Sequence, residues 1–479
     1  MHFVIEVAEY MKRLFPAIIL ILCIPTIMMK MAGCANIVPP GGGPRDSLPP
    51  VLVSASPNDS ALNVTTEKII INFNEFIELK NPNENILISP YPVKQPQTES
   101  KLRSVNIRLK DSLLPNTTYV IDFGNAIADI NEGNVLKNFR YVFSTGATID
   151  TNELSGRIVV AETGKTDSTF FAVLYRKQED STVVKEKPMY VTRVDSKGFF
   201  RFYNLPTGTF YVYALQDADG DKRYNQLSEA FAFADSAVAI GTDSRPVQLY
   251  AYTAEKIKPR RTTAETEKPG TVKRLTYTNN LESNAQDLLD SLKLTYTKPL
   301  KFVNVNSIQL FRDSTTPVTN VAISYDTVNK RIVLITPWQE GANYRLILDK
   351  EYAADTTGLK PTKNDTLNFR VKALKEYGSV RLRFKNLDLS RNPVLLLFTG
   401  EQQVGSYPLT GMEWYRTTYK PGEYELRILY DTNKNGVWDP GDYFSKPKRQ
   451  PEKVQNLEVR ITIKPNWDNE SNVEIATQQ

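Results

Sequence analysis

Two acidic loops in the chain carry side chains that could bind a metal ion. In residues 431–442, oxygen-bearing side chains stand at positions one, three, five, nine and twelve, and a glycine stands at position six. A hard cation such as Ca²⁺ takes about six to eight oxygen ligands, and glycine permits the sharp turn that directs them inward. The spacing therefore indicates calcium binding. The alternative is that Asp, Asn and Gly simply form a good turn after a strand.

This loop resembles the EF-hand-type calcium loop and is similar to the calcium loops of dockerins and of bacterial surface-protein B repeats. Two features differ from the EF-hand: an aspartate replaces the bidentate glutamate at position twelve, and residues 424–429 alternate as a strand where a helix would stand. The resemblance implies that Val437 binds through its carbonyl and that five residues bind through their side chains: Asp431, Asn433, Asn435, Asp439 and Asp442. Asp439 would bind either directly or through a water molecule.

A second, weaker candidate loop lies 214 residues earlier in the chain. Its oxygens at positions one, three, five and nine belong to Asp217, Asp219, Asp221 and Asn225. Glycine has moved to position four, and Glu229 lies one place beyond position twelve. Because each loop has few anionic ligands, both suit the weak Ca²⁺ binding of extracellular modules. Ca²⁺ is the only cofactor that the sequence predicts.

Cys34 indicates a different chemistry. Residues 11–13 supply a positively charged start, residues 14–29 are mostly apolar, and two small residues directly precede the cysteine. This pattern is typical of a signal peptide, residues 1–33, cleaved before Cys34. It resembles the bacterial lipoprotein export signal, which implies acylation of the Cys34 sulfur and amine. The alternative is a buried or interfacial helix followed by a chance cysteine.

A lipid anchor fits the length of this apolar run better than a transmembrane helix does. A spanning helix needs about twenty apolar residues, and this run is shorter and contains Pro16 and Pro25. Two or three acyl chains hold a protein firmly to a membrane, so the membrane is the first predicted partner. Glu6 and Glu9 fit poorly in a positively charged start, which leaves open whether translation begins at Met1 or Met11.

The composition after residue 33 excludes several classes of site. His2, Cys23 and Cys34 are the only histidine and cysteines of the chain, so the mature protein has no histidine and no free thiol. This excludes Ser-His-Asp and Cys-His nucleophilic sites and zinc sites built from imidazole and thiolate. Cleavage removes three basic and two acidic residues, so the formal charge falls from +5 to +4. Such a balance argues against nucleic acid as a partner.

The elements that position the loops are predicted to be strands in small sandwiches. Residues 34–50 are rich in proline and glycine and are expected to form a tether. Residues 51–147 alternate apolar and polar positions between turn clusters, which predicts an antiparallel β-sandwich. Its Pro57-Asn58-Asp59, Ile71-x-Phe73-x-Glu75, Leu114-Pro115-Asn116-x-x-Tyr119 and Tyr141-to-Thr145 motifs resemble the SbsA-type bacterial Ig-like domain, a family without enzymatic activity of its own.

Residues 151–252 are expected to form a sandwich of another kind. Their Gly156-to-Val160, Asp195-x-x-Gly198-x-Phe200-x-Phe202 and Leu205-Pro206-x-Gly208-x-Phe210 motifs resemble the transthyretin-like or carboxypeptidase-regulatory domain, which implies an accessory module and not a peptidase. Residues 253–273 are highly charged and poor in apolar residues, and they predict a flexible linker. A basic recognition arm is the alternative.

The same arrangement recurs after this linker, which predicts two duplicated pairs. Residues 274–373 are expected to form a divergent Ig-like sandwich, and residues 376–470 a second transthyretin-like sandwich with the acidic loop. The predicted equivalences are Leu292, Leu294 and Tyr296 with Ile69, Ile71 and Phe73; Tyr344 with Tyr119; Phe369 and Val371 with Tyr141 and Phe143; and Gly422, Tyr424, Leu426, Ile428 and Asp431 with Gly208, Phe210, Val212, Ala214 and Asp217.

The predicted fold is therefore all-β: four tandem antiparallel β-sandwiches in two duplicated pairs, after a cleaved signal peptide. The predicted function is a non-enzymatic, lipid-anchored cell-envelope protein that acts as a spacer or binding scaffold, possible partners being an envelope protein or a glycan. The alternatives are a carbohydrate-binding or adhesion lipoprotein and, more remotely, a hydrolase that uses only carboxylates. We expect an outer-membrane anchor with the domains in the periplasm, and exposure on the cell surface is the other orientation.

Overall fold

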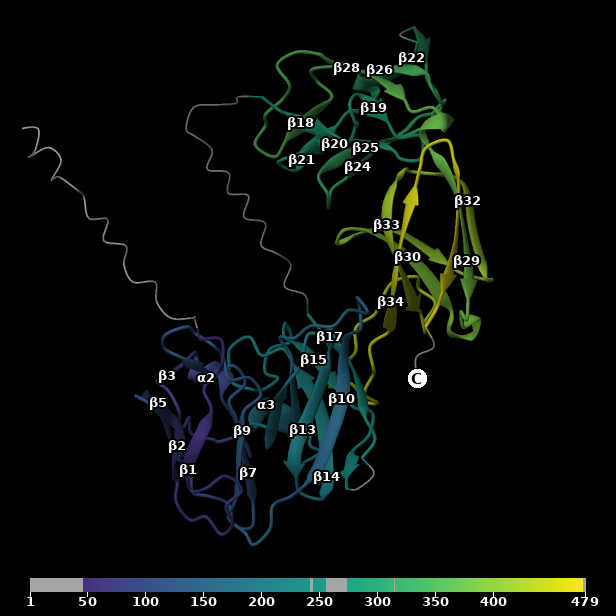
Figure 1. The fold of residues 1–479 in the computed structure, drawn as a ribbon. Coiled ribbons are helices and arrows are strands. Elements are labelled where there is room, and N and C mark those ends of the chain that lie inside the picture. Colours follow the sequence, from purple (N-terminus) through teal and green to yellow (C-terminus); the bar gives the residue numbers. More distant parts are fainter. Residues whose placement is uncertain (1–45, 242–243, 256–273, 314, 477–479) are drawn as a thin grey trace, which may run out of the picture.

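The structure, a computed structural model, describes residues 46–241, 244–255, 274–313 and 315–476 (Figure 1). Strands dominate these residues, and each helix among them is only three or four residues long. The predicted all-β fold class is confirmed. The predicted signal peptide, Cys34, most of the tether and nearly all of the linker lie outside the described residues. No helix within the described ranges is long and apolar enough to cross a membrane.

We call residues 46–150 the first unit. Three sheets, ordered β1-β2-β6-β5, β4-β7-β9 and β3-β8, enclose its core. Ile69, Ile71 and Phe73 of β2 are buried between partly exposed neighbours, because alternate strand residues face opposite sides. The elements are β1 (Leu52–Ser56), β2 (Lys68–Phe73), β3 (Ile77–Leu79), α2 (Pro82–Asn85), β4 (Leu87–Ser89), β5 (Gln97–Lys101), β6 (Ser104–Arg108), β7 (Thr118–Asp122), β8 (Ile127–Asp129) and β9 (Arg140–Ser144).

We call residues 151–255 the second unit. Its strands follow the order β12-β11-β14-β15-β17-β10-β13, β16 pairs with β14, and β10 runs parallel to β17. Leu154, Phe202 and Phe210 belong to its core. The elements are β10 (Asn152–Val160), β11 (Phe171–Tyr175), α3 (Thr182–Lys185), β12 (Tyr190–Arg193), β13 (Phe199–Leu205), β14 (Gly208–Leu215), β15 (Ala230–Phe233), β16 (Val238–Ile240) and β17 (Val247–Thr253).

We call residues 274–373 the third unit. Its sheets have the orders β18-β20-β25-β24, β19-β28-β26-β22-β23 and β21-β27 around a separate core. The strands are β18 (Tyr277–Asn279), β19 (Ala285–Gln286), β20 (Leu292–Tyr296), β21 (Leu300–Val303), β22 (Ile308–Arg312), β23 (Thr316–Pro317), β24 (Ala322–Asp326), β25 (Arg331–Ile335), β26 (Asn343–Leu348), β27 (Ala353–Asp355) and β28 (Asp365–Val371), with the 3₁₀ helix η1 (Val305–Ser307).

We call residues 374–476 the fourth unit. Its two sheets have the orders β31-β30-β33-β34 and β32-β29-β35, and β29 runs parallel to β35. A fourth core lies between them. The elements are η2 (Leu374–Glu376), β29 (Gly378–Lys385), η3 (Leu389–Arg391), β30 (Pro393–Thr399), β31 (Gln402–Pro408), β32 (Glu413–Tyr419), β33 (Gly422–Tyr430), β34 (Lys453–Ile463) and β35 (Asp468–Glu474).

The connectivity of the strands repeats between alternate units. The β31-β30-β33-β34 order of the fourth unit reproduces β12-β11-β14-β15 of the second, and β32-β29-β35 reproduces β13-β10-β17. In the same way, β18-β20-β25-β24 reproduces β1-β2-β6-β5 of the first unit. Each equivalent pair also keeps the same parallel or antiparallel direction. The duplication predicted from spaced residues is thus visible as shared topology.

One predicted equivalence is wrong by two positions. The sequence pattern pairs Phe369 with Tyr141, but Phe369 lies opposite Tyr344 in the β26–β28 pair, as Phe143 lies opposite Tyr119 in the β7–β9 pair. Phe369 therefore corresponds to Phe143, and Val371 has no Phe143-like place. The error has a simple cause: strand residues repeat their environment every second position, so a shift of two leaves the alternating pattern unchanged.

The units are arranged in space in the order first, second, fourth, third (Figure 1). The first and second units meet where Tyr91 N–H donates to the Met189 carbonyl (2.7 Å) and where the Arg140 guanidinium lies 3.4 Å from the centre of the Tyr203 ring. The second and fourth units meet where Val454 N–H donates to the Ala161 carbonyl (2.8 Å). The chain therefore folds back on itself, although its units follow one another in sequence.

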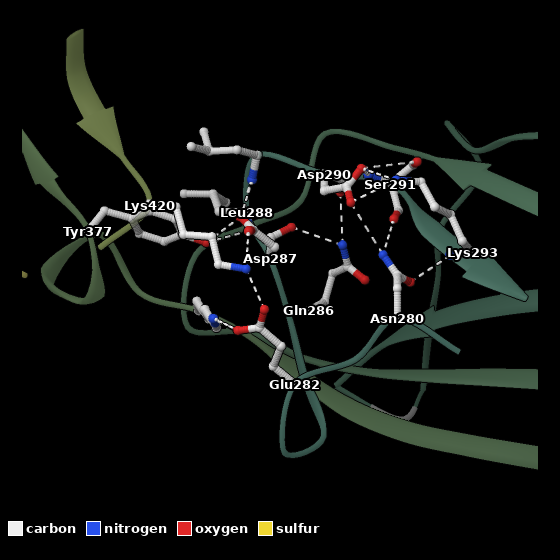
Figure 2. A network of polar contacts seen from close by, with 12 residues as sticks. Asn280, Glu282, Gln286, Asp287, Leu288, Asp290, Ser291, Lys293, Tyr377 and Lys420 are labelled. Atoms are coloured by element: carbon white, nitrogen blue, oxygen red, sulfur yellow. Dashed lines mark hydrogen bonds and ion pairs between the residues drawn. The ribbon is translucent and has the colours of Figure 1, made fainter. Parts of the chain in front are cut away.

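The third and fourth units are joined by a polar network (Figure 2). The Lys420 ammonium of the fourth unit pairs with Glu282 and lies 3.9 Å from a carboxylate oxygen of Asp287, both in the third unit. Tyr377 donates its hydroxyl proton to Asp287 (2.7 Å) and accepts the Leu288 N–H (2.7 Å). These directional contacts fix how the two units are oriented.

Candidate metal centre

The two acidic loops occupy equivalent places in the second and fourth units. One follows β14 and precedes β15, and the other follows β33 and precedes β34. Both preceding strands begin at a glycine with positive φ, 145° at Gly208 and 156° at Gly422, a backbone conformation that other residues rarely adopt. The β14–β15 and β33–β34 pairs therefore place the two loops at the same end of their sandwiches.

Three carboxylates converge in the second unit. Oxygens from Asp217, Asp219 and Glu229 lie within 4.8 Å of one another, a grouping of three that no other set of acidic residues makes within the described ranges. Asp217 and Asp219 come from the loop, whereas Glu229 is the residue directly before β15. Carboxylate oxygens at this separation are typical ligands for Ca²⁺ or Mg²⁺.

Glu229 is buried and only half satisfied. Its side chain belongs to a residue that is 3% exposed, and its Oε1 accepts the Ala218 N–H at 3.0 Å. Its Oε2 is buried and has no hydrogen-bond partner. Burial raises the pKa of this carboxyl, and the negative charges of Asp219 and Asp217 raise it further. A buried anion without a partner is costly, and a cation beside it would offset that cost.

Asp217 is already held by its own loop. Its Oδ1 accepts N–H bonds from Gly220 (3.1 Å) and Lys222 (3.2 Å), and its Oδ2 pairs with the Lys222 ammonium. The same ammonium lies 4.2 Å from the centre of the Phe171 ring. Lys222 therefore supplies one positive charge to the cluster.

Asp221 and Asn225, also predicted as ligands, are placed differently. Asp221 pairs with Arg223 at 3.2 Å and accepts a hydrogen bond from the Asn225 side-chain amide at 2.7 Å. The structure therefore brings together Asp217 and Asp219 with Glu229, which the loop pattern had placed outside the motif. The sequence feature that could have identified Glu229 is its position directly before β15, the strand that follows the loop.

The loop 431–442 gathers its side chains around hydrogen bonds within the chain. Asp431 is buried, and its two oxygens accept N–H bonds from Lys434 and Gly436, both at 2.7 Å. The amides of Asn433 and Asn435 donate to the same oxygen of Asp439, at 2.7 and 2.8 Å. Four predicted ligands thus lie in one turn-like cluster.

The remaining two predicted ligands, Asp442 and Val437, differ in their contacts. Asp442 accepts N–H bonds from Phe444 and Ser445, at 3.1 and 3.0 Å, outside the cluster, whereas the N–H of Val437 donates to Asn435 Oδ1 at 2.8 Å within the same turn. A buried carboxylate that the prediction missed, Glu452, accepts the N–H of Thr432 (2.7 Å) and of Asp439 (3.1 Å). Glu452 precedes β34 as Glu229 precedes β15, so each loop is closed by a buried glutamate.

An aromatic side chain that directly follows the loop 431–442 of the fourth unit lies against the second unit. Tyr443 is 1% exposed, and its ring packs edge-on against Phe231 (5.2 Å between centroids) and Phe233 (5.3 Å). Its hydroxyl is 3.2 Å from the hydroxyl of Tyr213. We call the hairpin that carries it, residues 439–452, the docking hairpin. Through Tyr443 it connects the loop region of the fourth unit to β15, the strand that follows the loop of the second unit.

The four tryptophans do not form an exposed surface on which a sugar could stack. Trp414 is buried, Trp338 donates its ring N–H to the Asp290 carbonyl (2.9 Å), and Trp438 donates to the Glu452 carbonyl (2.8 Å). Trp467 is 63% exposed. Among the described residues, these side chains make no row of exposed rings of the kind that a glycan platform would need.

Comparison with known proteins identifies the first unit. Residues 46–145 match the family described as the bacterial Ig-like domain. The first unit is an Ig-like β-sandwich. No curated protein matches the chain.

Solved structures also resemble the chain, at low similarity. They include the Bacillus anthracis TIE protein (11% identity, 92% of this chain and 76% of that one, TM-score 0.16) and the major pilin subunit BcpA of Bacillus cereus (10%, 67% and 99%, 0.17). The S-layer protein rSbsC shares 12% identity over 81% of this chain and 53% of its own, with a TM-score of 0.16.

Proposed function

We propose that this chain is a non-enzymatic structural protein of the bacterial cell envelope. Lipid on Cys34 tethers it to the outer membrane, and its four units stand in the periplasm as a braced spacer or binding scaffold. Ca²⁺ bound at an acidic loop adds stability. The observation that carries the proposal is the packing of the docking hairpin onto the second unit, because it joins parts of the chain that the sequence separates.

The contacts between units support a braced body. A scaffold must hold its binding surfaces at fixed separation, and separate sandwiches joined only by linkers would move relative to one another. Here a buried tyrosine, a main-chain hydrogen bond and ion pairs such as Lys448 with Asp180 (2.6 Å) connect the second and fourth units. Lys420 and Tyr377 do the same for the fourth and third.

The chemistry of the side chains also favours a structural role. The mature sequence has no histidine or thiol with which to activate a nucleophile. The carboxylates that converge, Asp217, Asp219 and Glu229, lie within 4.8 Å of one another. Glycosidases instead leave room for a sugar between their two carboxyl groups, whereas Glu229 of this group is only 3% exposed.

The anchor is tested by replacing the lipidated residue. In cells, Cys34→Ala is expected to move the protein from the membrane fraction to the soluble periplasmic fraction, because the residue that would carry the lipid has been replaced. Cys23→Ala is the matched control, since it removes the other cysteine of the signal and should leave fractionation unchanged. Equal membrane retention of both variants would contradict the anchor.

The scaffold role is tested by capture of neighbours. Crosslinking in intact cells followed by affinity purification should recover a reproducible envelope protein or glycan with the wild-type chain. The same partner should be lost from Tyr443→Ala, if the braced arrangement presents the binding surface. Hydrolysis of a glycan or peptide by the purified chain would contradict a non-enzymatic role.

A further inference from the structure

The loop of the second unit has a charge deficit that its twin lacks. Residues 217–229 contain four carboxylates and two basic side chains, a formal charge of −2. Residues 431–452 contain four carboxylates and four basic side chains, a formal charge of zero. One divalent cation would neutralise residues 217–229, whereas the charge of residues 431–452 is already balanced by lysine and arginine.

The buried glutamates of the two loops differ in the same sense. Glu452 Oε1 accepts the Thr432 N–H and hydroxyl, both at 2.7 Å, and its Oε2 accepts the Asp439 N–H. At Glu229, Oε1 accepts the equivalent N–H of Ala218, but Oε2 has no partner. An unsatisfied carboxylate oxygen inside the molecule, beside two further carboxylates, points to a cation as the missing partner.

The loop also carries part of the surface on which the fourth unit docks. Tyr224 is 3% exposed, and its ring stacks on Phe231 at 4.1 Å and faces Phe444 of the docking hairpin at 6.0 Å. Phe231 is two residues after Glu229 and contacts Tyr443. An ion that keeps Glu229 close to Asp217 and Asp219 would therefore also fix the position of the start of β15 and of the Phe231 ring on that strand.

We propose that Asp217, Asp219 and Glu229 bind one Ca²⁺ ion and that the bound ion stabilises docking of the fourth unit on the second. Asp219 lies on the exposed side of the cluster, so water can complete the coordination. Ca²⁺ is preferred to Mg²⁺ because a surface loop with irregular oxygen positions suits its flexible coordination better than the strict octahedron of Mg²⁺. The inference specifies which of the proposed calcium loops binds, and it does not depend on the lipid anchor.

The binding site is tested on the chain from residue 35 onward. Calorimetric titration with Ca²⁺ should show one site and a rise in melting temperature. Glu229→Gln, which keeps the side-chain shape, should abolish both effects and should itself melt no lower than wild type without Ca²⁺, because a buried charge is removed. Glu452→Gln in the twin loop is the matched control and should retain binding. Loss of binding in Glu452→Gln but not in Glu229→Gln would overturn the assignment, as would an equal response to Mg²⁺.

The coupling to docking is tested by amide hydrogen exchange. Ca²⁺ should slow exchange in peptides that cover residues 439–452 as well as in the loop 217–229, and Glu229→Gln should remove both effects. Protection confined to 217–229 would overturn the coupling. Both measurements use soluble protein, so they can fail while the Cys34 experiment succeeds, and the reverse.

Discussion

At the scale of single residues, buried carboxylates whose oxygens are satisfied by backbone N–H groups contrast with Glu229, the one buried carboxylate in the described part of the chain that has an oxygen without a partner. Asp129 accepts N–H bonds from Glu132 (2.6 Å), Gly133 (3.0 Å) and Asn134 (2.7 Å). Asp355, at the equivalent end of β27, accepts N–H bonds from Thr357 and Leu359, both at 2.9 Å. Each aspartate closes a turn after a short strand. Glu229 differs because half of its carboxylate is left without a donor.

Asp129 is expected to make the first unit sensitive to acid. Burial opposes its ionisation, but the N–H donors outweigh burial and lower its pKa below 3.8. A lowered pKa stabilises the fold fully above the unfolded value, and the stabilisation is lost as the pH falls through the folded value. Asp129→Ala should therefore cost about 1–3 kcal/mol at pH 7, because three amides lose their acceptor. Chemical denaturation at pH 7 and pH 3 measures this cost.

The control for this prediction is Glu99→Gln, which removes an exposed carboxylate from β5 of the same unit. It should change the free energy of unfolding by less than about 0.5 kcal/mol, as surface substitutions do. A loss in Asp129→Ala that is equally large at both pH values would contradict the titration argument, since protonation at low pH should already weaken the wild type.

At the scale of elements, the docking hairpin and the β-strands beneath it make the contact on which the arrangement depends. The close approach also requires a glycine: Gly164 has a φ of +67°, and a Cβ there would lie 2.5 Å from Asn456 N and 2.6 Å from the Val454 carbonyl oxygen. That contact is with β34. Side chains of the docking hairpin add to it, as when the Gln450 amide donates to the Phe233 carbonyl (2.9 Å).

Removing the buried ring should weaken this interface strongly. Tyr443→Ala is expected to cost about 3–5 kcal/mol of interaction between the units, because truncating a buried aromatic side chain leaves a cavity. Amide exchange of residues 230–233 and 439–452 should speed up, while exchange in the first unit stays unchanged. Tyr443→Phe, which keeps the ring and loses only the contact with the Tyr213 hydroxyl, should lose about 1 kcal/mol. An equal effect of both variants would contradict packing as the cause.

The junction of the third and fourth units gives a second prediction at this scale. Hydrogen bonds from Lys372 and Lys420 lower the pKa of Glu282 to about 2. Its stabilising contribution is thus complete above the ordinary value of 4.5 and is lost as the pH falls toward about 2. Lys420→Gln should raise the Glu282 pKa toward 4.5, as followed by NMR titration of the carboxyl carbon. An unchanged pKa would mean that the contact across the junction is not formed in solution.

At the scale of the whole molecule, the fold-back of the chain decides which surfaces are neighbours. The first and third units lie at the two ends, and the second and fourth units form the middle (Figure 1). Contacts such as Tyr213 with Tyr443, 230 residues apart, hold this order. A simple string of beads in sequence order would instead place the third unit next to the second.

A zero-length crosslink tests the order directly. The Lys448 ammonium lies 2.6 Å from an Asp180 carboxylate oxygen, so a carbodiimide should join these residues in the wild-type chain. Mass spectrometry should detect the joined peptides, and Tyr443→Ala should lose them, because the pair depends on docking. Lys448→Arg is the control without a reactive amine. Persistence of the crosslink in Tyr443→Ala would show that the hairpin docks without its tyrosine.

The local pattern of the sequence determined the strands and the duplication. Alternating apolar residues such as Ile69, Ile71 and Phe73 bury one face of a strand wherever they occur, and the repeat at Leu292, Leu294 and Tyr296 therefore reproduced the same topology. The register of Phe369 does not follow from this pattern, because a pattern of period two cannot distinguish shifts of two residues. The acidic loops were found for a similar reason, since their Asp and Asn spacing is local.

Only the tertiary structure decided which loop gathers carboxylates and which units touch. Glu229 joins Asp217 and Asp219 because the chain turns back into β15, a closure that the spacing of an open loop does not specify. Tyr443 lies with Phe444 in an otherwise polar segment, and the partners of Tyr443 lie on strands that are more than 200 residues away. Contacts over such separations are selected by the shape and chemistry of folded surfaces, and they leave no periodic trace in the sequence.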